Sequence, residues 1–431
     1  MRSFLLGLLL CTGVAYTAQS QRVCGTTEYT KQLLQSDPSF AAGSKKAIQQ
    51  ITATLSHKTT GNTARRDTAS NEIIYIPIVV HVLYKTATEN ISDAQIKSQI
   101  DALNKDFRRL NADRVNTPQA FKSLAADTRI QFCLAQVDPQ GKRTTGIDRK
   151  YTNRNFFTTD DAMKFAASGG ADSWNSKQYL NIWVVKLSGR TLAYATPPGA
   201  AADRDGLVIA YDVFGTIEKV RSVFDKGRTA THEIGHWLGL IHTWGDTSCG
   251  DDQVDDTPKQ QSYNFGCPTF PKLSTCSPDG NGDMFMNYMD FSDDACMNMF
   301  TWGQAKRMRA LFAQGNLRNS FLSSFACDSN LVQAGPVADT LPLTVTPPVV
   351  DLADTKVFPN PVSSVVTVES KLIGNHSIVN MRILNAVGVE VYNTRLNLLK
   401  TTHDLAKLKS GVYIIQVTAG NNVFTTKIIK L

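Results

Sequence analysis

The stretch from Thr231 to His242, THEIGHWLGLIH, constrains this chain more than any other. His232 and His236 lie four residues apart, so a helix places both imidazoles on one face, where they can bind the same metal ion. Gly239 permits the left-handed backbone that ends a helix, and the resulting turn brings His242 to that ion from another side. Three neutral imidazoles with an open fourth position are typical of a catalytic zinc site rather than a structural one.

Glu233 lies beside the expected ligands, where its carboxylate can activate a water molecule as a general base. The residues match H-E-x-x-H-x-x-G-x-x-H, which fixes five positions in eleven residues and uses three of the seven His in the chain. A chance pair of surface histidines can explain a bare H-E-x-x-H, but it does not explain the longer pattern. We therefore interpret the stretch as a zinc site.

The chain begins like an exported protein. Arg2 precedes an apolar run from Phe4 to Leu10 and then small residues up to Ser20, which predicts a signal peptide over residues 1–20. The run is too short to span a membrane, and no later segment is long enough. A lipid anchor on Cys11 is disfavoured by the bulky Leu10 before it. Export places the mature chain in an oxidising environment, and its remaining seven cysteines, an odd number, predict a free thiol or an intermolecular bond.

The formal net charge of +7 does not indicate nucleic-acid binding, because nine Lys/Arg against five Asp/Glu lie in residues 351–431. Residues 243–300, beside the zinc motif, contain ten Asp and two Lys. Such a segment favours cations or a basic substrate. Its part Asp251–Pro258 offers closely spaced oxygen ligands for calcium, although a solvated acidic turn fits the local sequence equally well.

Sequence patterns divide the rest of the chain. Residues 21–65 are polar, with a helical stretch near 45–55, and read as a pro-segment or flexible arm. The catalytic domain, 66–331, alternates strands with two long helices, which predicts an α/β sandwich. A Pro-rich linker spans 332–353, and 354–431 predicts a small all-β sandwich. We expect strands at 73–84 (with Pro77 marking an edge or irregularity), 130–137, 180–187 and 207–212, and helices at 92–109, 227–240 and 303–316. Ser92 with Gln95 predicts a capping box at the start of the first of these helices.

From about Ile73 to Cys327 the chain resembles the pappalysin family of metzincins, including its cytophagalysin branch. The similar residues are His232 to Asp246, VDDTP at 254–258, NYMD at 287–290 and DDACMNMF at 293–300. The resemblance implies a metzincin-type zinc protease domain with a mixed sheet, active-site and backing helices and a loop-rich C-terminal subdomain. It also implies Met289 as the Met-turn residue, calcium held by Asp252 and Thr257, and disulfides Cys249–Cys276 and Cys267–Cys296. The family often has Tyr where this chain has Phe291, so a transition-state donor must come from Tyr288 or another group.

Those two disulfides leave three mature cysteines. Cys133 and Cys327 lie in or beside the catalytic domain and can form a third bridge, which leaves Cys24 as the free thiol. Its thiolate can occupy the open zinc position, a cysteine switch similar to that of other metzincin zymogens. An ordinary disulfide of Cys24 is the alternative.

The resemblance places Asp294 at the floor of the S1′ pocket, with Asp293 as the adjacent alternative. A buried carboxylate there favours Arg over Lys, because the guanidinium pairs with it in bidentate geometry. We therefore expect cleavage N-terminal to Arg, with Lys second. Arg65 and Arg66 then become the expected site of self-activation, in exposed polar sequence; a solvated basic pair, or a site cut by a trypsin-like enzyme, is the alternative.

The tail resembles the C-terminal sorting domain of Bacteroidetes type nine secretion cargo, on VFPNP at 357–361, GVYIIQV at 411–417 and KIIKL at 427–431. This resemblance implies contact with the secretion machinery and export through the periplasm to the medium or cell surface. The alternative is an adhesive or carbohydrate-binding sandwich. The expected function is that of a secreted zinc endopeptidase, acting on proteins or peptides, with no nucleic-acid partner. Its rivals are a catalytically inactive, zinc-stabilised adhesion or binding protein, which has no need of Glu233, and a zinc amidase acting on non-peptide bonds.

Overall fold

The computed structural model describes residues 23–56, 72–278, 280–324, 326–327, 355–370, 379–385, 390–396, 399–419 and 422–431. The chain divides into two units, Met1–Asp328 and Ser329–Leu431. The expected signal peptide (1–20), the Arg65–Arg66 pair and the linker (332–353) lie outside the described residues. In the part of the chain that is described, no helix is both long and apolar enough to cross a membrane.

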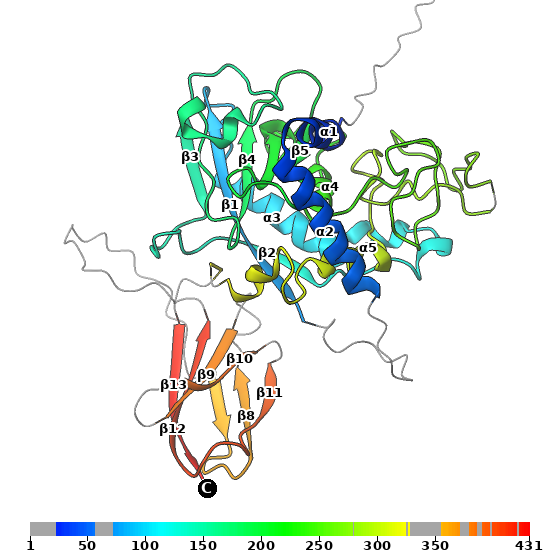
Figure 1. Cartoon of the computed structure of the whole chain (residues 1–431). Coiled ribbons are helices and arrows are strands. Elements are labelled where there is room, and N and C mark those ends of the chain that lie inside the picture. Colours follow the sequence, from blue (N-terminus) through cyan, green and yellow to red (C-terminus); the bar gives the residue numbers. More distant parts are fainter. Residues whose placement is uncertain are drawn as a thin grey trace, which may run out of the picture. The chain divides into compact units, whose positions relative to one another are not determined.

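A six-stranded sheet forms the centre of the first unit, in the order β2-β1-β4-β6-β5, with β3 following β2 along the same edge of β1 (Figure 1). The strand pairs are parallel except β5–β6, which is antiparallel. The strands are β1 (Ile74–Tyr84), β2 (Ile130–Leu134), β3 (Ile147–Tyr151), β4 (Leu180–Val185), β5 (Ala193–Ala195) and β6 (Gly206–Ala210).

Strand β1 is buried almost throughout and lies inside the sheet, so the expectation that Pro77 marks an edge strand is wrong. Pairing with β4 begins one residue later, at Ile78, so the missing N–H of Pro77 removes no bond from that ladder. The run of branched apolar residues reflects a strand that is covered on both faces.

Helices α3 (Asp93–Phe107) and α4 (Arg228–Trp237) share the main core cluster with one face of the sheet. Helix α3 begins where the sequence predicts, because Ser92 Oγ accepts the N–H of Gln95 at 3.0 Å. The Gln95 side chain donates to Phe214 O instead of closing a capping box. The helix therefore has the predicted cap and a side chain that ties it to the loop after β6.

Residues 23–56 are not a flexible arm, since they form helices α1 (Thr26–Ser36) and α2 (Pro38–Ser56) (Figure 1). These helices have too few apolar residues for a core of their own, but their apolar side chains complete cores built by the rest of the unit. Tyr29, Leu33 and Phe40 join a cluster on the second face of the sheet. Ile51 enters the main cluster.

The described residues between α4 and α5 (Trp302–Ala310) form turns and isolated bridges, as expected for a loop-rich subdomain. Three disulfides cross-link the unit: Cys249–Cys276, Cys267–Cys296 and Cys133–Cys327. Helix α5 ends at Ala310 instead of continuing to residue 316, and turns follow it. Short 3-10 helices are η2 (Ala112–Asn116), η3 (Gln119–Phe121), η4 (Ala162–Lys164), η5 (Ala166–Ser168), η6 (Tyr211–Val213) and η7 (Asn319–Ser323).

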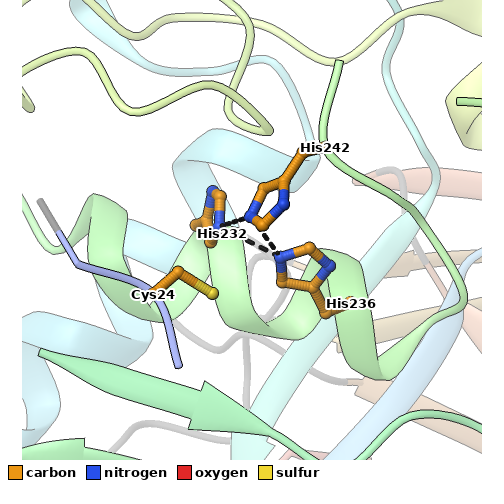
Figure 2. Close-up of side chains that lie close together, drawn as sticks. All are labelled: Cys24, His232, His236 and His242. Atoms are coloured by element: carbon orange, nitrogen blue, oxygen red, sulfur yellow. Dashed lines mark hydrogen bonds between the residues drawn. The ribbon is translucent and has the colours of Figure 1, made fainter. Parts of the chain in front are cut away.

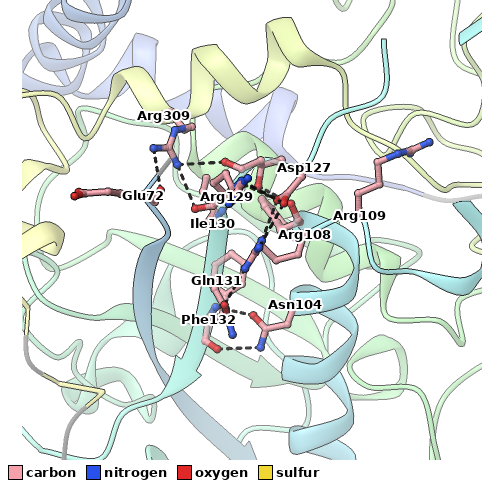
Figure 3. A network of polar contacts seen from close by, with 12 residues as sticks. Glu72, Asn104, Arg108, Arg109, Asp127, Arg129, Ile130, Gln131, Phe132 and Arg309 are labelled. Atoms are coloured by element: carbon pink, nitrogen blue, oxygen red, sulfur yellow. Dashed lines mark hydrogen bonds and ion pairs between the residues drawn. The ribbon is translucent and has the colours of Figure 1, made fainter. Parts of the chain in front are cut away.

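A polar network joins α3, β2 and α5 (Figure 3). Asn104 of α3 accepts the N–H of Phe132 and donates to its carbonyl, which satisfies backbone groups of β2. Arg309 of α5 donates to the carbonyls of Arg129 and Glu72. The chain entering β1 is therefore held to α5.

The second unit is an antiparallel β-sandwich, as the sequence predicts. One sheet has the order β10-β9-β12-β13 and the other β11-β8-β7, and residues of both sheets share one core cluster. The strands are β7 (Thr355–Phe358), β8 (Val365–Ser370), β9 (Val379–Asn385), β10 (Glu390–Leu396), β11 (Lys400–Asp404), β12 (Gly411–Ala419) and β13 (Asn422–Lys430).

Candidate metal centre

Helix α4 and the turn after it bring three imidazoles together. The Nε2 atoms of His232, His236 and His242 lie 3.0–3.2 Å from one another (Figure 2). Gly239 has φ 83°, the left-handed conformation that the turn to His242 requires. A tetrahedral zinc ion with bonds of about 2.0–2.1 Å to nitrogen separates its ligands by about 3.3 Å. The three nitrogens therefore fit one zinc ion.

A separate contact supports each imidazole from behind. The Nδ1–H of His232 donates to Tyr288 O at 2.7 Å, and that of His236 donates to Leu240 O at 3.0 Å. His242 donates to the carboxylate of Asp246 at 2.5 Å. These bonds fix the proton on Nδ1 and leave the Nε2 lone pair for a metal.

The electrostatics of the site also suit metal binding. Burial and the neighbouring His242 lower the pKa of His236 to about 3, so its imidazole is neutral. Burial opposes ionisation of Asp246, but its hydrogen bond with His242 keeps the net pKa of the carboxyl below its usual value. A neutral imidazole and an ionised supporting carboxylate are the forms that coordination needs.

Met289 lies beneath the cluster, where the resemblance places the Met-turn. A Cβ at Gly235 would lie 2.4 Å from Met289 Sδ, so only glycine permits this approach of α4 to the turn. Met289 is fully buried and packs in the main core. It supports the site by packing.

Cys24 lies at the open side of the three histidines (Figure 2). Its Sγ and the three histidine ligand atoms all lie within 4.8 Å of one another. Cys24 is a free cysteine, and its segment pairs in parallel with β5, where Gly25 N–H donates to Ala193 O at 2.8 Å and Leu192 N–H donates to Val23 O at 3.0 Å. Burial raises the pKa of the thiol, and a bound cation acts in the opposite direction.

The residues after Cys24 contact the expected general base. Thr26 Oγ1 donates to Glu233 Oε2 at 2.7 Å and accepts the N–H of Ala195 at 2.8 Å. Thr27 Oγ1 donates to Asp246 Oδ1 at 3.0 Å. Residues 24–27 of the expected pro-segment therefore lie at the open metal position and contact both the expected base and Asp246, which supports His242.

Asp294 is fully buried, and its Oδ2 accepts the N–H groups of Lys226 and Arg228 at the start of α4. Asp293 is half-buried, and its N–H donates to Gly266 O. Both residues lie on the segment after the Met-turn. The assignment of substrate specificity to Asp294 remains a prediction.

Tyr288 cannot replace the hydroxyl that Phe291 lacks. Its side chain is fully buried, and its OH accepts from Arg228 Nη1 at 3.2 Å, while its carbonyl faces His232. The phenol therefore belongs to the packing around the start of α4. Phe291 itself packs against His242, with ring centroids 4.9 Å apart.

The expected calcium ligands lie together. Thr257 Oγ1 lies 2.9 and 2.8 Å from the two carboxylate oxygens of Asp252, and burial raises the pKa of Asp252 to about 7. Among the described residues, the metal-ligating groups that cluster closely are those of the zinc site. Calcium binding stays a prediction.

Thr26, Thr27 and Asp246 were not predicted as functional residues. Asp246 follows His242 by four residues, a spacing that could have indicated a support for this ligand. The contacts of Thr26 and Thr27 depend on how the pro-segment docks, which no local pattern encodes.

Comparison with known proteins agrees with this geometry. A family model described as pregnancy-associated plasma protein-A matches residues 166–313, and one described as a secretion system C-terminal sorting domain matches residues 356–431. An extracellular metalloprotease of Pyricularia oryzae is 30% identical over 325 residues, which cover 73% of this chain and 96% of that protein.

Solved structures of mirolysin are also similar. Mature mirolysin of Tannerella forsythia in complex with a cleaved peptide is 48% identical, with a TM-score of 0.58, over 61% of this chain and 99% of that one. A promirolysin mutant of the same organism is 43% identical, with a TM-score of 0.64, over 73% of this chain and all of that one. The sorting domain and the extracellular relatives make this a secreted protein. With its three-histidine site and a similarity that covers nearly the whole length of these enzymes, the chain belongs to the pappalysin family of metzincin zinc metalloproteases.

Proposed function

We propose that this metalloprotease is made as a latent endopeptidase that cleaves N-terminal to Arg, with Lys second, after it has removed its own pro-segment. Export uses the C-terminal sandwich as a signal for secretion machinery, in line with the sorting-domain match. Latency, catalysis, specificity and activation each rest on a separate group of residues.

Latency rests on Cys24. The observation that carries the proposal is the position of its Sγ among the three histidine nitrogens. A thiolate there completes a four-ligand zinc site and excludes water from the reacting position. The match to a promirolysin structure supports a precursor form.

Catalysis rests on Glu233. Zinc, when bound, supplies Lewis-acid polarisation of the scissile carbonyl and lowers the pKa of water. Glu233 accepts the proton of the attacking water and transfers it to the leaving amine. Asp246, Leu240 and Tyr288 hold the imidazoles in orientation through their oxygens.

Specificity rests on Asp294, with Asp293 as the alternative. A carboxylate at the floor of the S1′ pocket favours a guanidinium, because the two groups pair in bidentate geometry. The support is the family resemblance together with the place of both residues directly after the Met-turn. We also propose that Asp252 and Thr257 bind calcium, which would stabilise the loop that contains them.

Activation rests on Arg65 and Arg66. Helix α2 ends at Ser56, and Glu72 lies at the entry to β1, so both arginines lie between the pro-segment and the first strand. Cleavage before either one separates the segment with Cys24 from the catalytic domain. The enzyme's own preference for Arg makes this cleavage self-catalysed.

The test uses the purified precursor with Glu233→Ala. It should retain zinc and should not mature alone, and added active enzyme should produce a chain that begins at Arg65 or Arg66 on N-terminal sequencing. Maturation of this variant without added enzyme, or a mature chain that begins at Asp67, overturns self-activation. Mass mapping that finds Cys24 in a disulfide overturns the thiol switch.

A further inference from the structure

The side chain of Tyr29 is buried among Asp161, Lys164 and Tyr194 of β5, and we call these three residues the Tyr29 crevice. The Tyr29 ring packs against Tyr194 of β5, with ring centroids 4.8 Å apart. Its hydroxyl donates to Asp161 Oδ2 at 2.6 Å, and Lys164 Nζ lies 3.5 Å from the phenol oxygen. Asp161, Lys164 and Tyr194 are 3%, 0% and 0% exposed, so the contact is made in the interior.

The polar groups of the crevice suit a phenol better than a benzene ring without a hydroxyl. Apolar packing alone would hold a phenylalanine, but here a carboxylate and an ammonium group meet one hydroxyl. Sites that hydrogen-bond a hydroxyl disfavour the analogue without it, because a buried carboxylate oxygen then loses its hydrogen-bond donor. Burial and the Asp161 carboxylate raise the pKa of Tyr29, so its hydroxyl remains a donor.

The groups that form the crevice also hold one another. Lys164 Nζ lies 2.9 Å from Asp161 Oδ1 and donates to Thr196 Oγ1 at 2.8 Å and to Arg204 O at 2.9 Å. Tyr194 OH donates to Asp161 Oδ1 at 3.1 Å. These residues belong to the expected catalytic domain, and their contacts with one another involve no residue of the pro-segment. The donor to Asp161 Oδ2 at 2.6 Å leaves with Tyr29, and Arg204 Nη1 remains 3.8 Å from that oxygen.

The crevice also adjoins the strand that holds the inhibitory segment. Tyr194 lies between Ala193 and Ala195, whose backbone groups bond Gly25 and Thr26. Chain bound along β5 therefore passes close to the crevice.

We propose that the crevice becomes an exosite of the mature enzyme, which binds a tyrosine side chain of a protein substrate. The proposal rests on the proposed function, because the pro-segment must leave before the crevice opens. In the precursor, Tyr29 occupies the position that we propose for the substrate tyrosine. Recognition at this position is separate from the arginine preference at the scissile bond.

The test measures binding to self-matured wild-type enzyme. The probe is a fluorescently labelled peptide with the sequence of residues 28–36, EYTKQLLQS. It lacks Cys24, Thr26 and Thr27 and therefore cannot make their contacts with the zinc site. The matched control is the same peptide with Tyr29→Phe. We expect the Tyr peptide to bind about tenfold or more tightly by fluorescence anisotropy, from the loss of a hydrogen bond to a charged group. Equal affinity, or no binding of either peptide, overturns the exosite.

An enzyme variant provides the second arm. Asp161→Asn should abolish the difference between the two peptides, and persistence of the difference in this variant overturns the assignment to Asp161. Since the change leaves Lys164 without its charged partner, cleavage of a short fluorogenic Arg peptide checks folding. If the variant does not fold, the comparison of Tyr and Phe peptides on wild-type enzyme decides. The short Arg peptide also tests the proposed function separately, because it contains no tyrosine for the crevice to bind.

Discussion

The contact between Thr26 and Glu233 should hold the precursor latent in addition to the thiol. The perturbation is Thr26→Val, which keeps the shape of the side chain and removes its hydroxyl. The background is a precursor with Arg65→Ala and Arg66→Ala, so that the proposed self-cleavage does not obscure the measurement. Thr26→Ser, which retains a hydroxyl, is the matched control.

The magnitude follows from the burial and the geometry. Thr26 and Glu233 are 4% and 1% exposed, and the hydroxyl oxygen lies 2.7 Å from the carboxylate. Hydrogen bonds to charged groups contribute about 1.5–3 kcal/mol, which corresponds to roughly 10- to 150-fold in an equilibrium constant, at about 1.4 kcal/mol per tenfold. The open fraction of the precursor, and with it the residual activity, should rise by that factor. The amide of Ala195 also loses its acceptor, which acts in the same direction.

The assay has two readouts. Cleavage of a fluorogenic Arg peptide reports an accessible active site, and the rate of Cys24 alkylation reports release of the thiol. Both should increase together for Thr26→Val, while Thr26→Ser should remain within a few-fold of the background. Equal rates for the Val and Ser precursors, with the chain still uncut, would show that the hydroxyl contributes nothing to latency.

Three further changes should separate metal binding, specificity and acid stability. His242→Ala should reduce the zinc content measured by atomic emission, because it removes one of three imidazoles; full zinc content would exclude His242 as a ligand. Asp294→Ala should reduce the Arg preference at P1′ by at least tenfold in a peptide library, and an unchanged profile would contradict the assignment. Asp148→Asn should lower the melting temperature at neutral pH, because the hydrogen bond with His81 holds the pKa of Asp148 below its usual value. The stabilisation is complete above the ordinary pKa of about 3.9 and is lost as the pH falls through the lower folded-state pKa. The difference between the two proteins should therefore shrink below about pH 4, and a constant difference down to pH 2 would refute this cause.

The zinc site could be predicted because its ligands and base lie in one short motif. A helix and one glycine turn bring His232, His236 and His242 together, and both are local structures that the residues themselves favour. The long strand β1 and the cap at Ser92 could be predicted for the same reason. Each depends on neighbouring residues in the chain.

The errors concern contacts between distant segments. Residues 23–56 are too polar to form a core alone, yet Phe40 and Ile51 become fully or almost fully buried against other parts of the unit. Strand β5 has three residues and is defined by its pairing with β6. Tyr288 was a reasonable substitute donor by position, but its phenol points to Arg228. Tertiary packing determines such positions, and the periodicity of apolar residues along the sequence does not encode it.

The proposed loss of the pro-segment would give the precursor and the mature enzyme different cores, because it removes Ile51. Ile51 is 2% exposed, belongs to the same cluster as α4, and its Cδ1 would lie 3.2 Å from a Cβ at Gly239, the turn that leads to His242. When the pro-segment leaves, the mature enzyme loses a side chain that filled the region beneath its active-site turn. The mature form would therefore keep a fold that was formed while the contacts of the pro-segment were present. We therefore expect its lifetime to depend on the barrier to unfolding rather than on an equilibrium, so a denatured mature chain should regain its fold slowly unless the excised segment is supplied.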